Sequence, residues 1–281
     1  MFRMSFNACA IAAALLLTLP LGAQVADGDR HFAARAEGAQ GARAKTGPID
    51  AAIAAYQRAV AADANDLEAH WKLLRAYRYK GAYVAANAEQ KKQIYGAAKS
   101  AGEKAVAAAY KKLGANEKTA EKQVADAARK VPGAAEVFLW DAVNWGEWAL
   151  AYGKLAAARQ GAADRIRREA TIAHLADSRI EGGAPSRVLG RLHDQTPRIP
   201  FVTGWASSKE ALRFLNESLK ADPDNKLTML FLAEAMVAND SSTKGRAKQI
   251  LHGVVNNPNH PQYPVEDAAA VDDAKALLAK W

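Results

Sequence analysis

Apolar residues recur every three or four positions from Pro48 onward, almost without interruption. This spacing places them on one face of successive helices, and the alternating Val-, Ile- and Thr-rich runs typical of strands are missing from the sequence. Alanine is abundant throughout, and its high helix propensity and small side chain suit closely packed helices. The pattern therefore predicts an all-α fold with almost no strand.

The most informative pattern is an internal repeat. Residues Asp50–Tyr77 align at a constant offset with Lys209–Met236, and each copy reads as a helix, a short polar turn and a second helix. Residues identical between the copies form the pairs Ala52/Ala211, Ala62/Ala221, Asp63/Asp222, Leu73/Leu232 and Ala76/Ala235. We therefore predict two copies of one helical hairpin.

Each copy resembles a tetratricopeptide (TPR) unit at the residues that pack such a hairpin. In the first copy the small Ala52 and Ala59 flank the large Tyr56, which lets a second helix approach closely while the aromatic ring fills the groove. In the second copy the turn Asp222–Asn225 has Pro223 where the TPR pattern usually has proline, and Asp or Asn there caps the next helix. Because the TPR period of about 34 residues is not kept through the middle, we predict helical hairpins stacked as a divergent TPR-like α-solenoid.

The N-terminal segment has the layout of a signal peptide. Arg3 precedes an apolar run over residues 8–19, and the small Gly22 and Ala23 follow it. The run is shorter than the roughly 20 residues that a membrane-spanning helix needs. We predict cleavage near Ala23; an uncleaved anchor is the alternative.

The one cysteine, Cys9, lies ahead of most of this apolar run instead of directly after it. The sequence therefore has no lipobox, and cleavage leaves no thiol for disulfides, metal binding or catalysis. We expect a periplasmic protein that is exported and soluble after cleavage.

Three regions divide the chain in this interpretation. Gly38, Gly41 and Gly47 interrupt a weak helical pattern behind the signal peptide. The predicted division is a signal peptide over residues 1–23, a linker or marginal helix over 24–47 and one TPR-like all-helical domain over 48–281.

Charge and motifs indicate little chemistry. The formal net charge is +8, but Lys and Arg are spread over many predicted helices and mixed with Asp and Glu, so a solvated surface is favoured over nucleic-acid binding. The sequence has no nucleophile elbow and no His-Glu-x-x-His pair, and its six histidines lack carboxylates at ligand spacing. We predict no catalytic residue, no metal site and no cofactor, and a protein that is not an enzyme.

Residues 133–160 form the most aromatic stretch, and they include Trp140, Trp145, Trp148 and Tyr152. Helical spacing predicts that Trp140, Trp148 and Tyr152 lie near one face, with Trp145 turned partly away. Such a stripe is either core or the wall of a pocket, where large rings bury apolar ligand surface at low entropic cost. We take these four residues as candidates for binding a small apolar or amphipathic ligand.

A second candidate group consists of Arg187, Arg191 and His193, which follow one another within two turns of a predicted helix. Placed on one face, they would meet an acidic group of a ligand or partner. The alternative is a solvated face.

The middle and C-terminal order of these segments resembles the T component of tripartite ATP-independent periplasmic (TRAP) transporters, over residues 50–255. The resemblance rests on Leu139-Trp140, Asn144-Trp145-Gly146 and Trp148, on the turn Gly182–Pro185 running into Arg187–Gly190, and on the Pro197 segment leading to Asp222–Asn225. It implies a periplasmic protein of cryptic TPR repeats that associates with a solute-binding protein and passes a small, partly apolar ligand through a central pore. Members of that family are typically lipoproteins, and this chain departs from them there.

The function that the sequence predicts is that of a non-catalytic periplasmic adaptor accessory to TRAP-type solute uptake. Its expected partners are a solute-binding protein or another envelope protein and a small apolar ligand, and not nucleic acid. The alternative is a general cell-envelope TPR scaffold that holds peptides or assembly factors in its groove. A pore and a stable homo-oligomer would favour the first function, and an open monomeric groove the second.

Overall fold

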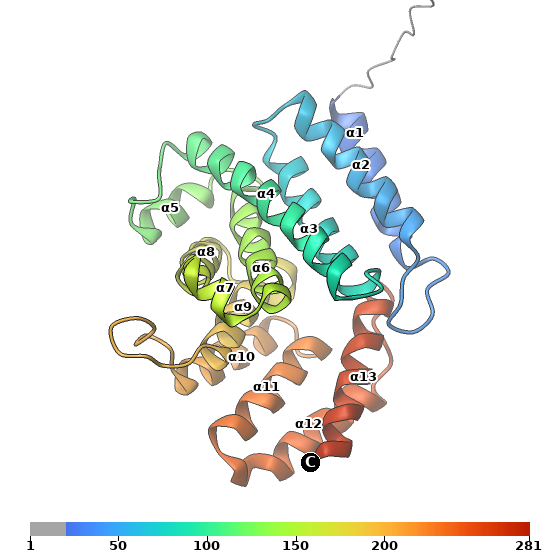
Figure 1. Ribbon diagram of the computed structural model, residues 1–281, viewed down its shortest axis with the longest axis vertical. Helices are drawn as coiled ribbons and strands as arrows, with labels where there is room; N and C mark the ends of the chain where they lie inside the picture. Colours follow the sequence, from blue (N-terminus) through green and yellow to red (C-terminus); the bar gives the residue numbers. More distant parts are fainter. Residues whose placement is uncertain (1–20) are drawn as a thin grey trace, which may run out of the picture.

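The computed structural model describes residues 21–281, and within this range the chain consists of helices joined by turns, with no strand (Figure 1). The predicted signal peptide lies for the most part in residues 1–20, outside the described residues. The helices, in chain order, are α1 (Leu21–Ala33), η1 (Ala34–Ala36), α2 (Thr46–Ala62), α3 (Leu67–Tyr83), α4 (Ala88–Leu113), α5 (Glu121–Ala128), α6 (Ala134–Tyr152), α7 (Lys154–Arg159), α8 (Ala162–Ala176), α9 (Ile180–Gln195), α10 (Ser208–Ala221), α11 (Lys226–Asn239), η2 (Ser241–Thr243), α12 (Lys244–Asn256) and α13 (Pro264–Lys280).

Each long helix packs against the next long helix of the chain. Helix α4 packs on α6 and α6 on α8, so that the short α5 and α7 are set beside the stack (Figure 1). Consecutive helices that are joined by short turns and bury one face against each other form hairpins. The described chain is therefore all-α, with helical hairpins stacked as a divergent TPR-like α-solenoid, which confirms the predicted fold class.

The two copies of the repeat form α2–α3 and α10–α11, and the same local device starts the second helix of each. The side chain of Asp66 accepts hydrogen bonds from the backbone N–H groups of Glu68 and Ala69 at the start of α3. Asn225 accepts one from the N–H of Thr228 at the start of α11. Such side chains satisfy N–H groups that have no partner within the helix, so short polar turns are enough to set both hairpins.

Residues 24–47 differ from the linker that the sequence offers as one interpretation, because they contain most of the packed helix α1. Gly28 lies against the ring of Tyr56, where an added Cβ atom would clash with the ring. The hydroxyl of Tyr56 donates a hydrogen bond of 2.8 Å to Asp29, and Lys72 forms an ion pair of 2.6 Å with the same carboxylate. A glycine weakens an isolated helix, but here it allows the close approach that fixes α1 on α2 and α3.

The first and last parts of the chain meet, so the stack closes on itself. Arg35, just after α1, forms an ion pair of 3.0 Å with Glu266 on α13 and also donates to the backbone carbonyl of Gln262. Val265 is buried in the same apolar cluster as the residues of α1, α2 and α3. Figure 1 shows the start of α13 beside the end of α3, although the two are far apart in sequence. We call these contacts the clasp.

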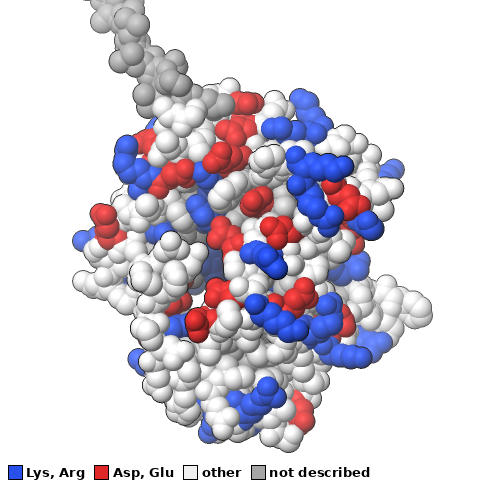
Figure 2. Space-filling model, turned by 180° about the vertical axis from the view of Figure 1, so that it is seen from behind, with Lys and Arg blue, Asp and Glu red and all other residues white. Residues whose placement is uncertain are grey.

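The outer surface carries both signs of charge. Figure 2 shows acidic and basic side chains intermingled over the face that it views. No helix within residues 21–281 combines the length and the apolarity that crossing a bilayer requires.

Candidate ligand and partner site

The aromatic residues of α6 form a ladder that is mostly core. Trp145 and Trp148 are 3% and 4% exposed, and their rings meet edge to face at 5.5 Å. Tyr152 stacks on Trp148 at 4.8 Å and is the one member of the ladder that reaches the surface. Lys99 lies over the Trp145 ring, so a cation already occupies that face. The structure thus gives Trp145 and Trp148 the core position that the spacing left open.

Trp140 is separate from this ladder. It is partly buried and packs at the edge of a different apolar cluster, the one that contains Phe138 and Leu139. The expected face of Trp140, Trp148 and Tyr152 is therefore wrong, and Trp145 belongs to the ladder instead. The reason is that residues three and four positions apart are neighbours on a helix, a relation that holds for positions 145, 148 and 152.

The charge of the half-buried Arg191 is neutralised by carboxylates of the protein itself. Its guanidinium forms ion pairs of 2.9 Å with Glu234 on α11 and 3.2 Å with Asp194, and it lies over the ring of Phe231. With two carboxylates beside it, Arg191 holds α9 to α11.

His193 does not share the face of Arg191, because two positions along a helix lead to the opposite side. Its ring lies against Trp205 and Phe214, and its Nδ1 accepts a hydrogen bond of 3.2 Å from the N–H of Ser207. Burial lowers the pKa of His193, so the imidazole is neutral near pH 7. His193 thus supports the α9–α10 loop from within.

Arg187 differs from both. It is half-buried on α9, and its Nη1 donates 3.1 Å to the hydroxyl of Thr228 and 3.5 Å to the carbonyl of Gly182. No carboxylate among the described residues lies within ion-pair distance of it. Burial, and then the charge of Arg78, lower the pKa of Arg187 to about 10. The group is still charged at pH 7, and its two bonds are to neutral oxygens.

The charges around Arg187 come from helices far apart in sequence. Arg75 on α3 pairs with Glu181 at 3.2 Å, and Arg78 pairs with Glu147 on α6 at 3.4 Å. The charges of Asp222 and Glu181 act on Arg187 and raise its pKa against the lowering by Arg78, and the charges of Arg35 and Arg75 act on Tyr263. We define the charged cluster as Arg35, Arg75, Arg78, Glu147, Glu181, Arg187, Asp222, Tyr263 and Glu266.

Pairing within the charged cluster is incomplete. Arg35, Arg75 and Arg78 each have one glutamate partner at 3.0 to 3.4 Å, whereas Arg187 has none among the described residues. A guanidinium presents a planar fork of donors that fits a carboxylate or phosphate. The cluster therefore offers one fork to an anion from outside.

The sequence alone identified Arg187 but missed Arg35, Arg75 and Arg78. One signal was present: Arg75 and Glu234 occupy equivalent positions of the two repeat copies, each among apolar residues. Both pair with residues of α9, Arg75 with Glu181 and Glu234 with Arg191. The two residues have opposite charges, but a charged residue at the same repeat position among apolar ones indicates the side of α3 and α11 that faces α9.

A second group of buried charges consists of two carboxylates that share one arginine. Asp141 on α6 is fully buried and Glu169 on α8 nearly so, and Arg165 pairs with them at 2.8 Å and 3.0 Å. Burial raises the pKa of both carboxyls. Gly102 leaves the space that Asp141 occupies, since a Cβ atom there would overlap the carboxylate. We call Asp141, Arg165 and Glu169 the carboxylate cluster.

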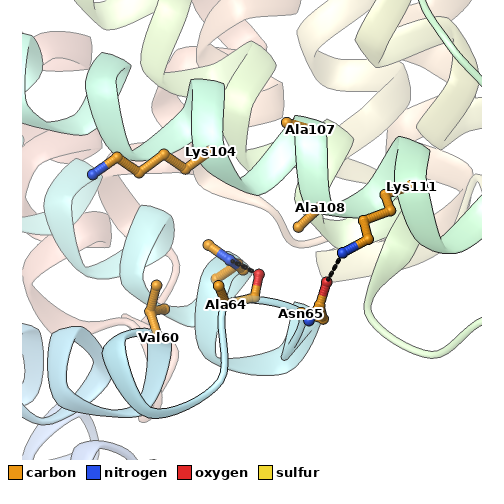
Figure 3. Close-up of a pocket in the computed structure, with 8 residues that line it drawn as sticks. Val60, Ala64, Asn65, Lys104, Ala107, Ala108 and Lys111 are labelled. Carbon is orange, nitrogen blue, oxygen red and sulfur yellow. Dashed lines mark hydrogen bonds between the residues drawn. The ribbon is translucent and has the colours of Figure 1, made fainter.

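An open recess of about 350 Å³ lies between the α2–α3 turn and α4 (Figure 3). Its lining consists of Val60, Ala64, Asn65, His70, Lys104, Ala107, Ala108 and Lys111. His70 bonds the carbonyl of Ala64 at 3.0 Å and Lys111 donates 3.3 Å to Asn65 (Figure 3). These polar groups are already bonded to one another, so this recess is a weaker candidate than the charged cluster. No group of three or more residues of metal-ligand type is gathered anywhere in residues 21–281.

Comparison with known proteins adds distant structural likeness. No protein-family model and no curated protein matches the sequence. Among solved structures, the chain is similar to one described as the TPR2AB-domain:pHSP90-complex of yeast Sti1, with 15% identity over 92% of this chain and 97% of that chain, and a TM-score of 0.28. At that TM-score the likeness decides nothing about the site.

Proposed function

We propose that the protein is an exported, periplasmic TPR-type adaptor accessory to TRAP-type solute uptake, and that it binds a carboxylate presented by a solute-binding protein. Arg187 carries the proposal, because it is a charged, half-buried guanidinium whose partners in the described chain are neutral. The resemblance of the aromatic helix and the following turns to the TRAP T component supplies the class of partner. The fold supplies hairpins that gather residues of α3, α6, α9 and α13 around one group.

Chemistry at Arg187 follows from its surroundings. A carboxylate that docks on the fork replaces water beside a guanidinium that burial has already partly desolvated, so less desolvation remains to be offset on binding. The ion pairs of Arg75 and Arg78 keep the neighbouring helices in place. In this proposal Arg187 binds the carboxylate, and Arg75 and Arg78 hold the helices around it.

Binding to a TRAP solute-binding protein, measured by isothermal titration calorimetry and native mass spectrometry, tests this function. We expect a complex with the wild-type chain and a loss of roughly tenfold in affinity for Arg187→Gln, as for one charge-assisted hydrogen bond. Arg187→Lys retains the charge without the fork, and we expect an intermediate loss.

Arg246 provides the matched control, since it is exposed on α12 and Arg246→Gln removes the same charge. Unchanged affinity of Arg187→Gln, or an equal loss for Arg246→Gln, would contradict the proposal. Binding of unrelated peptides without a solute-binding protein would instead support a general envelope scaffold.

The periplasmic part of the proposal has its own test. Burial of α1 begins at Gln24 and Val25, whereas Gly22 is exposed, so cleavage near Ala23 leaves the packed part of the helix intact. N-terminal sequencing of chain from the periplasmic fraction should find Gln24 or a close neighbour first. Recovery of uncleaved chain in the cytoplasmic fraction would contradict export.

A further inference from the structure

The large apolar residues at the surface are concentrated in two segments. Among the described residues, the exposed ones outside these segments are Leu175 and Tyr263, both close to the limit of partial burial. The others are Leu150, Tyr152, Leu155, Ile199, Phe201 and Val202. Phe201 is fully exposed and Leu150 is 78% exposed. Single exposed apolar residues are ordinary, but a concentration of them marks an interaction site.

The two segments are connected through the start of α8. The α9–α10 loop, residues 196–207, is held at its base by Trp205, whose Nε1 donates 3.0 Å to Asp164 in the first turn of α8. Arg167 of α8 also lies over the Trp205 ring. Helix α7 leads directly into α8, and the loop stands out from the helices (Figure 1). We call Leu150–Leu155 and Ile199–Val202 together the apolar patch.

The loop is built to display its tip. The hydroxyl of Thr203 accepts a hydrogen bond of 3.0 Å from the N–H of Ile199 and donates to the carbonyl of Pro197. Phe201 has φ 63°, a left-handed conformation that is costly for a bulky residue. The internal bonds of the loop hold an aromatic side chain in this conformation with its whole ring in solvent.

Within the two segments themselves all charged residues are basic, and the exposed Asp164 lies at the base of the loop. Residues 150–160 and 196–206 contain Lys154, Arg159 and Arg198, and no Asp or Glu. All three basic residues are exposed. Figure 2 shows the loop as a white protrusion with basic side chains beside it.

We propose that the apolar patch docks on an anionic lipid surface. Exposed apolar side chains insert at the boundary of headgroups and acyl chains, and Lys and Arg beside them are attracted to anionic lipid. A second copy fits less well, because a two-fold contact pairs this patch with itself and would bring the basic Lys154, Arg159 and Arg198 of both chains into one interface. The patch thus provides a peripheral membrane contact at a place distinct from the charged cluster.

Flotation of the full chain with lipid vesicles tests the proposal. We compare vesicles of phosphatidylcholine alone with vesicles of phosphatidylcholine and phosphatidylglycerol, for the wild type and for the double variant Phe201→Asn, Val202→Ser. We expect binding to the anionic vesicles that weakens with added salt and falls roughly tenfold in the double variant. Asn tolerates the left-handed conformation at position 201, so circular dichroism and the thermal midpoint should show a folded variant.

Two controls make the result specific. The N-terminal apolar run is the same in every variant, so the difference between variants reports the patch alone. Leu175→Ser changes an exposed apolar residue elsewhere on α8 and should bind vesicles as the wild type does. Equal vesicle binding by the wild type and the double variant, or equal binding to both vesicle types, would overturn the proposal. The proposal would also be overturned if the double variant kept its vesicle binding but sedimented with a lower mass than the wild type, since that result assigns the patch to a second copy.

Discussion

The charged cluster and the carboxylate cluster are both partly desolvated groups of ions, and they differ in which group lacks a partner at close range: an arginine in the first and carboxylate oxygens in the second. In the charged cluster, Arg187 lacks a carboxylate partner among the described residues. In the carboxylate cluster, Asp141 and Glu169 share Arg165, and Asp141 Oδ1 and Glu169 Oε2 each lack a hydrogen-bond donor. Burial raises the pKa of both carboxyls.

The difference lies in whether the group that lacks a close partner can change its charge near neutral pH. A carboxyl pair takes up a proton, which neutralises one member and supplies the missing donor. Arg187 cannot release its proton near neutral pH, because its pKa is lowered only to about 10. The carboxylate cluster can therefore satisfy its own groups, whereas Arg187 stays charged with neutral oxygens as its hydrogen-bond partners.

Removing Arg165 should give the largest effect. In Arg165→Ala two buried carboxyls lose their shared cation, and we expect the free energy of unfolding at pH 7 to fall by about 3 kcal/mol, measured by urea denaturation. Lys122→Ala, which removes an exposed partner of Asp126, should change it little. Equal stability of Arg165→Ala and wild type would show that the cluster is not desolvated.

Neutralising Glu169 should change how stability depends on pH. Because burial raises the folded-state pKa of Glu169 above its unfolded value, the folded chain holds a proton that the unfolded chain has released. This contribution is present below the unfolded pKa and is lost as the pH rises through the folded pKa.

Glu169→Gln mimics the protonated form, so its unfolding free energy should fall less with rising pH than that of the wild type. Denaturation curves from acidic to alkaline pH measure this slope. Asp141, Glu103 and Arg168 also act on the site and are unchanged in the variant. Parallel curves for the two proteins would exclude a shared proton.

The smallest effect should be at Arg187. In Arg187→Gln no carboxylate loses a cation within ion-pair distance, so we expect the unfolding free energy to stay within about 0.5 kcal/mol of wild type. Arg78→Gln leaves Glu147 without its ion-pair partner and should lower the unfolding free energy by about 1–2 kcal/mol. The reverse order in chemical denaturation would make Arg187 a structural residue.

Local features were predictable from the sequence. The hairpins α2–α3 and α10–α11 were predictable because their signals are short-range. These signals are small and large residues at helical spacing, and Asp66 or Asn225 at the start of the second helix. The packing of α1 was not, since it depends on Gly28 meeting Tyr56 of another helix. A glycine reads as an interruption in the sequence and becomes a contact only in the fold.

The candidate site was predictable only in part, for the same reason. Arg187 and Arg191 are one turn apart on α9, and nothing in that spacing says that Glu234 neutralises the second and leaves the first without a carboxylate. The aromatic ladder follows from spacing once Trp145 is included, but its burial depends on α4 and α8. Ion pairing across helices is a tertiary property, and the repeat alignment of Arg75 with Glu234 gave only its side.

The clasp between Arg35 and Glu266 changes how the array comes apart. In a linear stack each hairpin contacts only its neighbours, so the terminal units fray first and open the rest in turn. Where the first and last helices of the described chain touch, fraying of either one must also break a contact between residues 231 positions apart. Such a contact forms late, after both ends exist, so its loss should speed unfolding far more than it slows folding. The clasp thus makes the lifetime of the native state, more than its rate of formation, depend on the two ends of the chain.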